Sequence, residues 1–345
     1  MRFRRFYTRG FRNLKPGELV LGPGVTAVVG KNVAGKTNLL EGLYLAAGGE
    51  MRGTIAERIA FGEGEALLGA ELSGYLGDFE VEQRLLPTKR LFFLNRAPAS
   101  HRELLALPGA VWLSPGDLFV IKGPPEERRR FLDTLISRFS PRYRALLAAY
   151  ERAVRQRNAA LKAGGRGVEP FSHQVATLGA EIMELRRRAV ERLEPLVAEV
   201  YRVIAPGEVS LSLKESTSPK RLAAALSEHL GEELERGATL FGPHRDDLRI
   251  LLSGRDATRF SSRGEARTLA LALRLAEHRM LEEHHGEPPV LLLDDVVSEL
   301  DEERQRALIA YIRGVEQAVV TATKPPEGAD RVVEIKEGAW EVVGA

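Results

Sequence analysis

Residues 30 to 37 read GKNVAGKT and combine residue types that can bind phosphate. Gly30, Gly35, Lys36 and Thr37 occupy the required positions of the pattern G-x-x-x-x-G-K-[ST]. Glycines let backbone N–H groups curl around a phosphate, Lys36 adds positive charge for catalysis, and the Thr37 hydroxyl is a ligand for Mg²⁺. The predicted nucleotide-binding residues here are Gly30, Lys31, Asn32, Val33, Ala34, Gly35, Lys36, Thr37 and Asn38.

The residues on either side of this loop favour a strand followed by a helix. Residues 25–29, VTAVV, form a short β-branched run suited to a buried strand. Residues 36–47 place Leu39, Leu40, Leu43 and Ala47 on one stripe of a helix. Strand, loop and helix in this order are the structural context that a phosphate-binding loop requires.

A second segment with side chains that could take part in catalysis is PVLLLDDVVSELD, residues 289–301. Its apolar residues predict a strand buried on both faces, and two carboxylates follow at the carboxyl end, where ligands of parallel sheets bind. We expect Asp294 to hold Mg²⁺ and Asp295 to act as general base or to orient the attacking water. A pair of solvated aspartates at a strand end is the alternative, which the phosphate loop in the same chain disfavours.

The nucleotide is expected to be ATP. The two motifs lie far apart in the chain, and no N-K-x-D motif for reading guanine is present. This separation leaves room for lobes inserted between the motifs.

Residues 260–284 predict a helix that begins with a capping box, because Glu265 follows Ser262 by three residues. The same segment is similar to the signature loop of ABC-type ATPases, which meets an ATP held by the opposite subunit. A helix N-terminus with free N–H groups suits a γ-phosphate. The signature residues so predicted are Ser262, Arg263, Gly264 and Glu265. SELD at 298–301 is similar to a D-loop, with Ser298 and Asp301 at the same interface.

The order of the elements predicts an α/β fold with a helical insertion. Segments near 66–72, 79–85 and 90–95 are expected to be neighbouring strands of an antiparallel unit. Residues 110–118, AVWLSPGDL, are expected to end this unit with a Pro-Gly turn. Two long amphipathic helices are expected over Glu126–Leu161 and Phe171–Ile204, forming a short antiparallel arm. The expected organisation is an ATPase lobe over 1–117, an inserted helical lobe over 118–235, and the return to the ATPase lobe, with its mixed sheet, over 236–345.

The bulk properties are those of a globular protein that works without disulfides. The chain has 345 residues, 44% hydrophobic and 28% charged, a net charge of +2 and no cysteine. No apolar run is long enough to span a bilayer, and no signal peptide is evident. We therefore expect a cytoplasmic protein that does not bind membranes.

Taken together, these motifs resemble the RecF family of DNA recombination and repair proteins, relatives of the SMC proteins. The resemblance runs along nearly the whole chain. Besides the ATPase motifs it rests on FRN at 11–13, LSPGDLFVIKGPPEERRRFLD at 113–133, YERAVRQRNAALK at 150–162 and FGPHRDDL at 241–248. Within FRN, Arg12 and Asn13 are expected to contact the nucleotide.

The resemblance implies ATP-dependent binding to double-stranded and gapped DNA. It also implies an ATP-driven homodimer, DNA-stimulated ATP hydrolysis, and delivery of recombinase with the partners RecR and RecO. The ATPase subunit of a transporter and a full SMC protein remain alternatives. A transporter usually has a glutamine loop and a switch histidine, and the arm expected here is short for an SMC protein.

Some residues depart from the usual patterns. Val33 stands where many relatives carry glycine. Asp295 stands where many ABC and SMC ATPases have glutamate, and its shorter reach predicts slow hydrolysis. No residue is identified for the glutamine loop, and either Thr321 or Thr323 could replace the switch histidine.

Clusters of arginine are the candidates for DNA contact, although charged helix faces are more often simply solvated. They comprise Arg128, Arg129 and Arg130, then Arg152, Arg155 and Arg157, then Arg186, Arg187 and Arg188. Phosphate contacts need several cations on one surface, and backbone contacts would give little sequence preference. His244 and Asp246 or Asp247 could suggest a metal pair, but a turn organised by Arg245 and Asp247 is the favoured interpretation.

Overall fold

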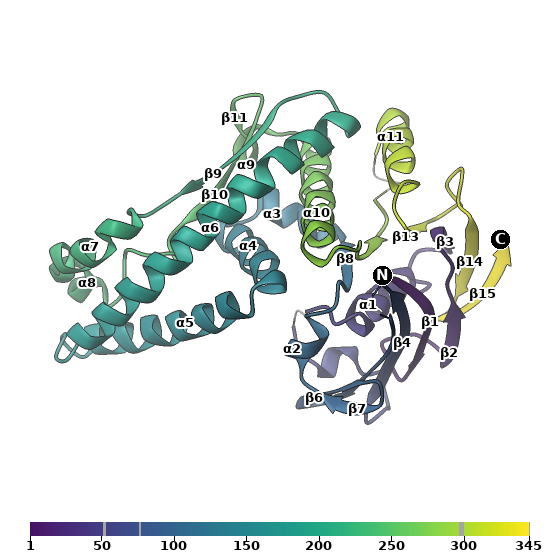
Figure 1. The fold of residues 1–345 in the computed structure, drawn as a ribbon, viewed down its shortest axis with the longest axis horizontal. Helices are drawn as coiled ribbons and strands as arrows, with labels where there is room; N and C mark the ends of the chain where they lie inside the picture. Colours follow the sequence, from purple (N-terminus) through teal and green to yellow (C-terminus); the bar gives the residue numbers. More distant parts are fainter. Residues whose placement is uncertain (51–52, 76, 297–299, 345) are drawn as a thin grey trace. The chain divides into compact units, whose positions relative to one another are not determined.

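The computed structural model describes residues 1–50, 53–75, 77–296 and 300–344 (Figure 1). The chain divides into two compact units. The first consists of Met1–Asp117, Val203–Ala205 and Ala270–Ala345, and the second of Leu118–Arg202 and Pro206–Leu269.

A mixed sheet in the first unit carries the strands that flank the two chemical motifs. Its order is β15-β14-β3-β13-β12-β8, with β15 antiparallel and the other pairs parallel. The bounds are β3 Gly24–Val29, β8 Ala110–Leu113, β12 Val290–Leu293, β13 Gln317–Ala322, β14 Arg331–Lys336 and β15 Ala339–Gly344. Every residue of β12 and β13 is buried, as expected for central strands covered on both faces.

An antiparallel sheet in the same unit has the order β2-β1-β4-β5-β6-β7. Its strands are β1 Arg2–Arg9, β2 Gly17–Val20, β4 Ala66–Gly74, β5 Gly77–Leu86, β6 Lys89–Leu94 and β7 Ala97–Ala99. The predicted antiparallel neighbours β4, β5 and β6 are confirmed. The strand of AVWLSPGDL, in contrast, does not close this sheet, because β8 pairs in parallel with β12 of the mixed sheet.

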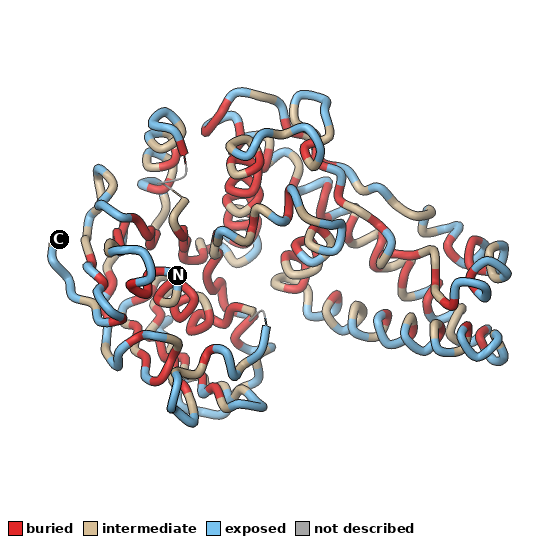
Figure 2. Tube along the Cα trace, turned by 180° about the vertical axis from the view of Figure 1, so that it is seen from behind, coloured by how far each residue is buried: buried red, intermediate tan, exposed pale blue. Residues whose placement is uncertain are grey.

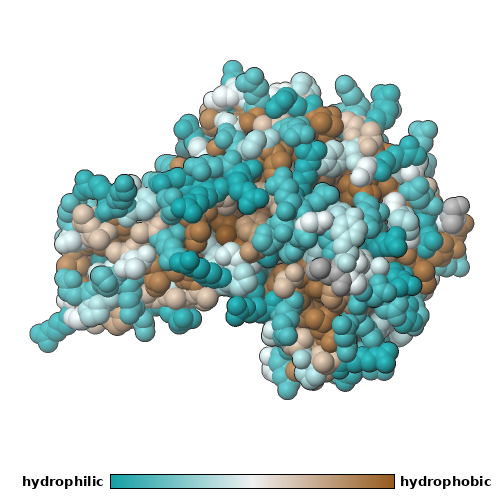
Figure 3. All heavy atoms as spheres, in the orientation of Figure 1, coloured by the Kyte–Doolittle hydropathy of each residue, from teal (hydrophilic) through white to brown (hydrophobic). Residues whose placement is uncertain are grey.

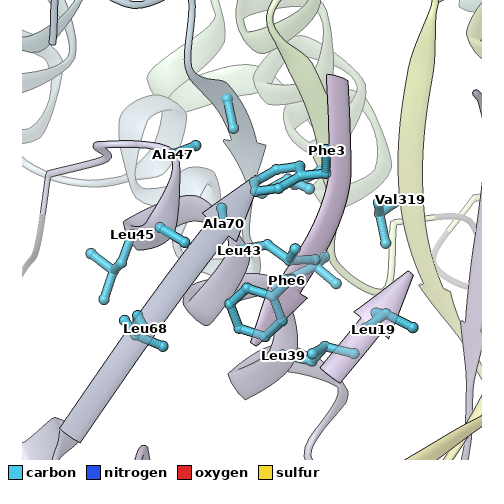
Figure 4. Packing of buried hydrophobic residues seen from close by; sticks show 14 of the residues in the cluster. Phe3, Phe6, Leu19, Leu39, Leu43, Leu45, Ala47, Leu68, Ala70 and Val319 are labelled. Atoms are coloured by element: carbon cyan, nitrogen blue, oxygen red, sulfur yellow. The ribbon is translucent and has the colours of Figure 1, made fainter. Parts of the chain in front are cut away.

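Helix α1, Lys36–Ala46, contacts strands of both sheets and joins their hydrophobic core. Figure 4 shows Leu39 and Leu43 of α1 beside Phe3 and Phe6 of β1. A Cβ on Gly42 would lie 2.9 Å from the Phe6 ring, so glycine permits this close approach. The other short or C-terminal helices of the first unit are η1 Ala56–Arg58, α2 His101–Leu104, η2 Pro115–Asp117 and α11 Glu302–Ile312.

The second unit is mainly helical. Its elements are α3 Leu118–Lys122, α4 Pro125–Phe139, α5 Pro141–Lys162, α6 Glu169–Ile204, β9 Val209–Lys214, η3 Pro219–Arg221, α7 Leu222–Glu228, α8 Leu230–Arg236, β10 Asp247–Leu252, β11 Arg255–Asp256, α9 Ala257–Phe260 and the start of α10 Arg263–His285.

The helix predicted over Glu126–Leu161 is in fact two helices, α4 and α5, which is a correction. Ser140 between them is extended, with φ −134° and ψ 92°, and its side chain accepts a hydrogen bond from the Tyr143 N–H. Pro141 occupies the first turn of α5, and proline disfavours helical geometry at the residue before it. The break leaves α5 with 22 residues, about 33 Å at 1.5 Å per residue.

Helices α5 and α6 form the predicted antiparallel arm. Arg142, near the start of α5, pairs with Glu181 of α6, whereas Arg157, near the end of α5, donates to Ser172, near the start of α6. The two helices therefore run in opposite directions. Tyr143 and Tyr150 of α5 pack in one core with residues of α6, including Val175 and Ile182. Figure 2 shows buried and exposed residues alternating along these helices, which is typical of amphipathic segments.

Residues 236–269 pack in the second unit, whereas the sequence predicted the return to the ATPase lobe at 236. Strand β10 pairs with β9, and Arg128 of α4 forms a bidentate ion pair with Asp247 at the start of β10. The other boundary, after Asp117, coincides with the predicted one.

Over the described ranges, no helix is both long and apolar enough to cross a membrane. On the face shown in Figure 3, hydrophilic side chains cover most of the surface and hydrophobic ones form smaller groups between them.

We expect Asp246→Asn to raise the free energy of unfolding at pH 8 by about 1–3 kcal/mol. Asp246 is buried and accepts a 2.7 Å hydrogen bond from the Ser216 N–H, but its Oδ2 accepts none from the described residues. Burial raises its pKa from 3.8 to about 6. Because the folded-state pKa is the higher one, the charged carboxylate costs stability above pH 6, and the cost disappears below about pH 4.

Urea unfolding between pH 4 and 8 measures this effect. The gain from Asp246→Asn should shrink as the pH falls through 6. Asp78→Asn is the matched control, because the Asp78 side chain is 65% exposed and its change should have little effect at any pH. A gain for Asp246→Asn that is equal at pH 4 and pH 8 would contradict the burial argument.

Candidate functional site

The predicted phosphate loop connects β3 to α1, and its two defining glycines are sterically required. A Cβ on Gly30 would overlap the backbone oxygen of Ile335. Gly35 has φ 114° and precedes α1 without a side-chain cap, so the first N–H groups of the helix face the loop. This is the arrangement that binds an anion at a helix N-terminus.

Lys36 is 5% exposed and folds back over the loop. Its Nζ donates to the backbone oxygens of Gly30 at 2.9 Å and Lys31 at 3.2 Å. These contacts hold the positive charge within the curve of the loop, where a phosphate would be attracted.

Val33, which stands where many relatives carry glycine, has a strained backbone at the tip of the loop. It has φ 68° and is 93% exposed. This left-handed conformation costs a β-branched residue about 1–2 kcal/mol. Asn13 supports the loop by donating to the Val33 oxygen at 3.4 Å, and Asn38 donates to Asn13 at 2.7 Å.

Arg12 lies beside the loop, but its guanidinium group binds Glu41 of α1. Nε and Nη2 donate to the two carboxylate oxygens at 2.9 and 3.2 Å, and Arg58 donates to the same carboxylate at 3.1 Å. Arg12 thus joins the loop region to α1, and a nucleotide contact by Arg12 stays a prediction.

Asp294 and Asp295 follow β12 at the carboxyl edge of the mixed sheet. The Thr37 hydroxyl donates to Asp294 Oδ1 at 3.1 Å, which brings the two chemical motifs together. Burial, and then the neighbouring Asp295 charge, raise the pKa of Asp294, while hydrogen bonds from Thr321 and Thr37 oppose the shift.

The residues at this edge fit a Mg²⁺ ion. Asp294 Oδ2 is buried and accepts no hydrogen bond from the described part of the chain. A hard cation prefers oxygen ligands such as this carboxylate and the Thr37 hydroxyl. In the described ranges no group of three or more acidic or histidine side chains could hold a metal ion, so the fit at this edge rests on Asp294 and Thr37.

Thr321 of β13 contacts both aspartates. Its hydroxyl donates to Asp294 Oδ1 at 2.8 Å and accepts from the Asp295 N–H at 2.7 Å. Thr323, the other residue considered for the switch position, is exposed. Sequence alone left these two threonines equivalent, because the pairing of β13 with β12 was not visible in it.

Ser114 is a residue of this edge that sequence reasoning missed. It directly follows β8, the parallel neighbour of β12, and the Asp294 N–H donates to the oxygen of Leu113. Asp117 accepts hydrogen bonds from the Ser114 N–H and hydroxyl at 2.7 and 3.2 Å. A polar residue directly after a buried strand was the available signal.

The signature segment in the second unit forms the predicted capping box. The Ser262 N–H donates to Glu265 at 2.7 Å, and the Glu265 N–H donates to the Ser262 hydroxyl at 3.2 Å. Ser262 and Arg263 are exposed, while Gly264 is partly buried. Contact with a nucleotide across a dimer stays a prediction for all four residues.

Of the D-loop residues, Ser298 lies outside the described residues. Asp301 caps α11, because its side chain accepts a 3.0 Å hydrogen bond from the Arg304 N–H. Its predicted role at an interface is not tested by this contact.

Three of the arginines predicted to contact DNA are buried in ion pairs, which corrects their assignment. Arg128 is 4%, Arg157 0% and Arg186 2% exposed. Arg157 donates to Glu233 at 2.6 Å, and Arg186 donates to both oxygens of Asp133. Releasing such a charge from its partner costs several kcal/mol, so these residues cannot serve a DNA surface.

The other predicted arginines differ in exposure. The Arg129 side chain is 14% exposed and donates to the backbone oxygen of Asp246. Exposed or half-exposed side chains remain at Arg130, Arg152, Arg155, Arg187 and Arg188.

The GPHRDDL segment is a turn, as favoured. Arg245 donates to the Thr239 oxygen at 3.1 and 3.0 Å, and Asp247 binds Arg128. His244 lies 2.6 Å from the Tyr150 hydroxyl, and burial lowers its pKa to about 4. The histidine is therefore a neutral structural residue near pH 7.

Comparison with known proteins relates this architecture to a family. A family model described as the RecF/RecN/SMC N terminal domain matches residues 2–339. The chain is 42% identical over 339 residues to the DNA replication and repair protein RecF of Deinococcus radiodurans, covering 97% of this chain and 94% of the relative. It is 36% identical to RecF of Lactobacillus delbrueckii subsp. bulgaricus over 344 residues, covering 92% and 90%.

Solved structures agree with these sequence matches. The structure of the recombination mediator protein RecF bound to ATP has a TM-score of 0.90 and 30% identity, covering 99% of this chain and 97% of that one. The Smc head domain of Pyrococcus furiosus has a TM-score of 0.60 at 17% identity, covering 99% and 95%, and shows a shared fold. The phosphate loop, the Thr37–Asp294 contact and these likenesses together establish that the chain belongs to the RecF family and has the α/β fold of RecF and SMC-head ATPases.

Proposed function

We propose that this chain is an ATP-dependent DNA-binding protein of recombinational repair and replication-gap processing in the cytoplasm. The observation that carries the proposal is the 3.1 Å contact between Thr37 and Asp294, which joins a phosphate loop to a buried carboxylate. The name of its relatives, DNA replication and repair protein RecF, supports a role in DNA repair. The similar RecF structure with ATP supports ATP as the nucleotide.

In the proposed reaction, the loop N–H groups and Lys36 bind the phosphates of ATP. Thr37 and Asp294 would hold Mg²⁺, which neutralises phosphate charge when bound. Asp295 orients the attacking water or accepts its proton. Its carboxylate is one carbon shorter than the glutamate of many related ATPases, which supports slow hydrolysis.

ATP binding is proposed to drive head-to-tail dimerisation on DNA. The exposed Ser262 cap presents the N-terminus of α10, whose partial positive charge suits the γ-phosphate of an ATP in the second copy. Slow hydrolysis would then release the dimer. We infer that the DNA-bound dimer helps to load recombinase at gapped DNA together with RecR- and RecO-type partners.

DNA contact in this proposal falls to the exposed or half-exposed arginines, Arg130, Arg152, Arg155, Arg187 and Arg188. Their targets would be backbone phosphates, so duplex binding should weaken with salt and depend little on sequence.

Lys36→Met should lower ATP turnover by about 100-fold or more, since a buried cation that stabilises phosphate charge is lost. Duplex DNA should raise the turnover of the unaltered protein. Steady-state phosphate release with and without duplex measures both effects. Lys89→Met, which alters an exposed lysine of β6, should retain full turnover. If duplex DNA changes neither turnover nor ATP-dependent binding, the repair function is contradicted.

Asp295→Asn should preserve ATP binding, lower turnover by about 100-fold, and prolong the dimer, because the amide cannot accept the proton of the attacking water. Light scattering follows the mass with ATP, and phosphate release follows the chemistry. Lys36→Met, which lacks the cation of the phosphate loop, should bind ATP more weakly and stay monomeric under the same conditions.

Two results would contradict this arrangement. Unchanged turnover in Asp295→Asn would remove Asp295 from its role. A monomeric mass for the unaltered protein saturated with a non-hydrolysable ATP analogue would remove the head-to-tail dimer.

A further inference from the structure

Thr321 is a polar residue in the most buried layer of the ATPase unit. It lies in β13, between β3 and β12, and its side chain is 0% exposed. A buried hydroxyl without a partner is destabilising, so the hydrogen bonds of Thr321 determine how it is accommodated.

The Thr321 hydroxyl uses its single proton on Asp294 Oδ1, at 2.8 Å, and accepts the N–H of Asp295, at 2.7 Å. Since Thr37 also donates to Asp294 Oδ1, at 3.1 Å, two donors converge on one oxygen of the carboxylate. These bonds fix the rotation of the Asp294 side chain and leave Oδ2 without a donor among the described residues.

The bond to Asp295 acts on the backbone. Asp295 has φ 52°, a left-handed conformation that aspartate adopts more readily than most residues but still at a cost. Its N–H is directed at Thr321, which stabilises the sharp turn of the chain directly after β12. One hydroxyl therefore constrains both carboxylate-bearing residues.

We propose that Thr321 is a positioning residue for the Mg²⁺ site: its hydrogen bonds orient the Asp294 carboxylate, whose Oδ2 keeps no donor among the described residues, and hold the backbone turn at Asp295. The inference rests on the proposed ATPase function. The role that it gives Thr321 differs from that of the switch histidine, for which the sequence offered Thr321 and Thr323. Hydrogen-bond partners of metal ligands typically change metal affinity by about 10–100-fold when removed.

The neighbouring strand provides a matched control. Thr26 of β3 pairs with Val319 of β13 and is 1% exposed. Its hydroxyl has no hydrogen-bond partner among the described residues. Thr26→Val therefore makes the same chemical change in the same sheet without removing a bond to either aspartate.

The test measures binding of a fluorescent, non-hydrolysable ATP analogue during Mg²⁺ titration, with EDTA as the metal-free reference. Thr321→Val should raise the half-saturating Mg²⁺ concentration by about 10-fold or more and leave binding in EDTA unchanged. Thr321→Ser, which keeps the hydroxyl, should restore the midpoint to near that of the unaltered protein. Thr26→Val should not shift it.

Thermal unfolding establishes that each variant is folded. If Thr321→Val does not fold, Thr321→Ala and Thr321→Ser form the decisive pair, because they differ only in the hydroxyl group. The inference predicts a higher Mg²⁺ midpoint for Thr321→Ala than for Thr321→Ser.

Three results would overturn the inference: an unshifted midpoint in Thr321→Val, an equal shift in Thr26→Val, or a failure of Thr321→Ser to restore it. Each leaves the proposed ATPase function intact, provided the unaltered protein binds the analogue in a Mg²⁺-dependent manner. If the unaltered protein binds no analogue at all, the proposed function fails together with the role of Thr321.

Discussion

The parallel order β3-β13-β12 is the constraint on which the site depends. Parallel strands end at the same edge of a sheet, so the residues that follow β3 and β12 meet there although 257 positions separate Thr37 from Asp294. The strand between them, β13, is also parallel and contributes Thr321 at the same edge. A change in this strand order would leave both motifs intact in sequence and separate them in space.

The phosphate loop keeps an unfavourable conformation because rigid elements hold both of its ends. On one side β3 is a fully paired strand of the mixed sheet, and on the other α1 packs against two sheets through a glycine that lets it approach Phe6. Glu41 of α1 binds Arg12 and Arg58 at the same time, which ties the helix to one segment before it and one after it. These contacts offset the strain at Val33, whose left-handed backbone a β-branched side chain disfavours.

The arm illustrates how one residue type can serve two purposes. Arg157 and Arg186 belong to clusters that also contain exposed arginines. Their own side chains, however, are buried against Glu233 and Asp133 between packed helices. Each buried pair fixes the relative position of the segments that it joins, since a lone charge there would be strongly destabilising. In a helix, neighbouring residues point about 100° apart, so a run of arginines necessarily includes both inward and outward positions. Sequence could identify the clusters but not which members face the core.

The sequence by itself determined the elements that are specified locally. The phosphate loop, the buried strand before Asp294, the capping box at Ser262 and Glu265, and the antiparallel strands β4 to β6 follow from spacing and periodicity within short segments. Tertiary structure alone decided the pairing of β8 with β12, the packing of residues 236–269 in the second unit, and the contact of Thr321 with both aspartates. Local patterns define which face of an element is apolar, whereas these features depend on which distant element covers that face, and this choice is made by packing and hydrogen bonding across the whole chain.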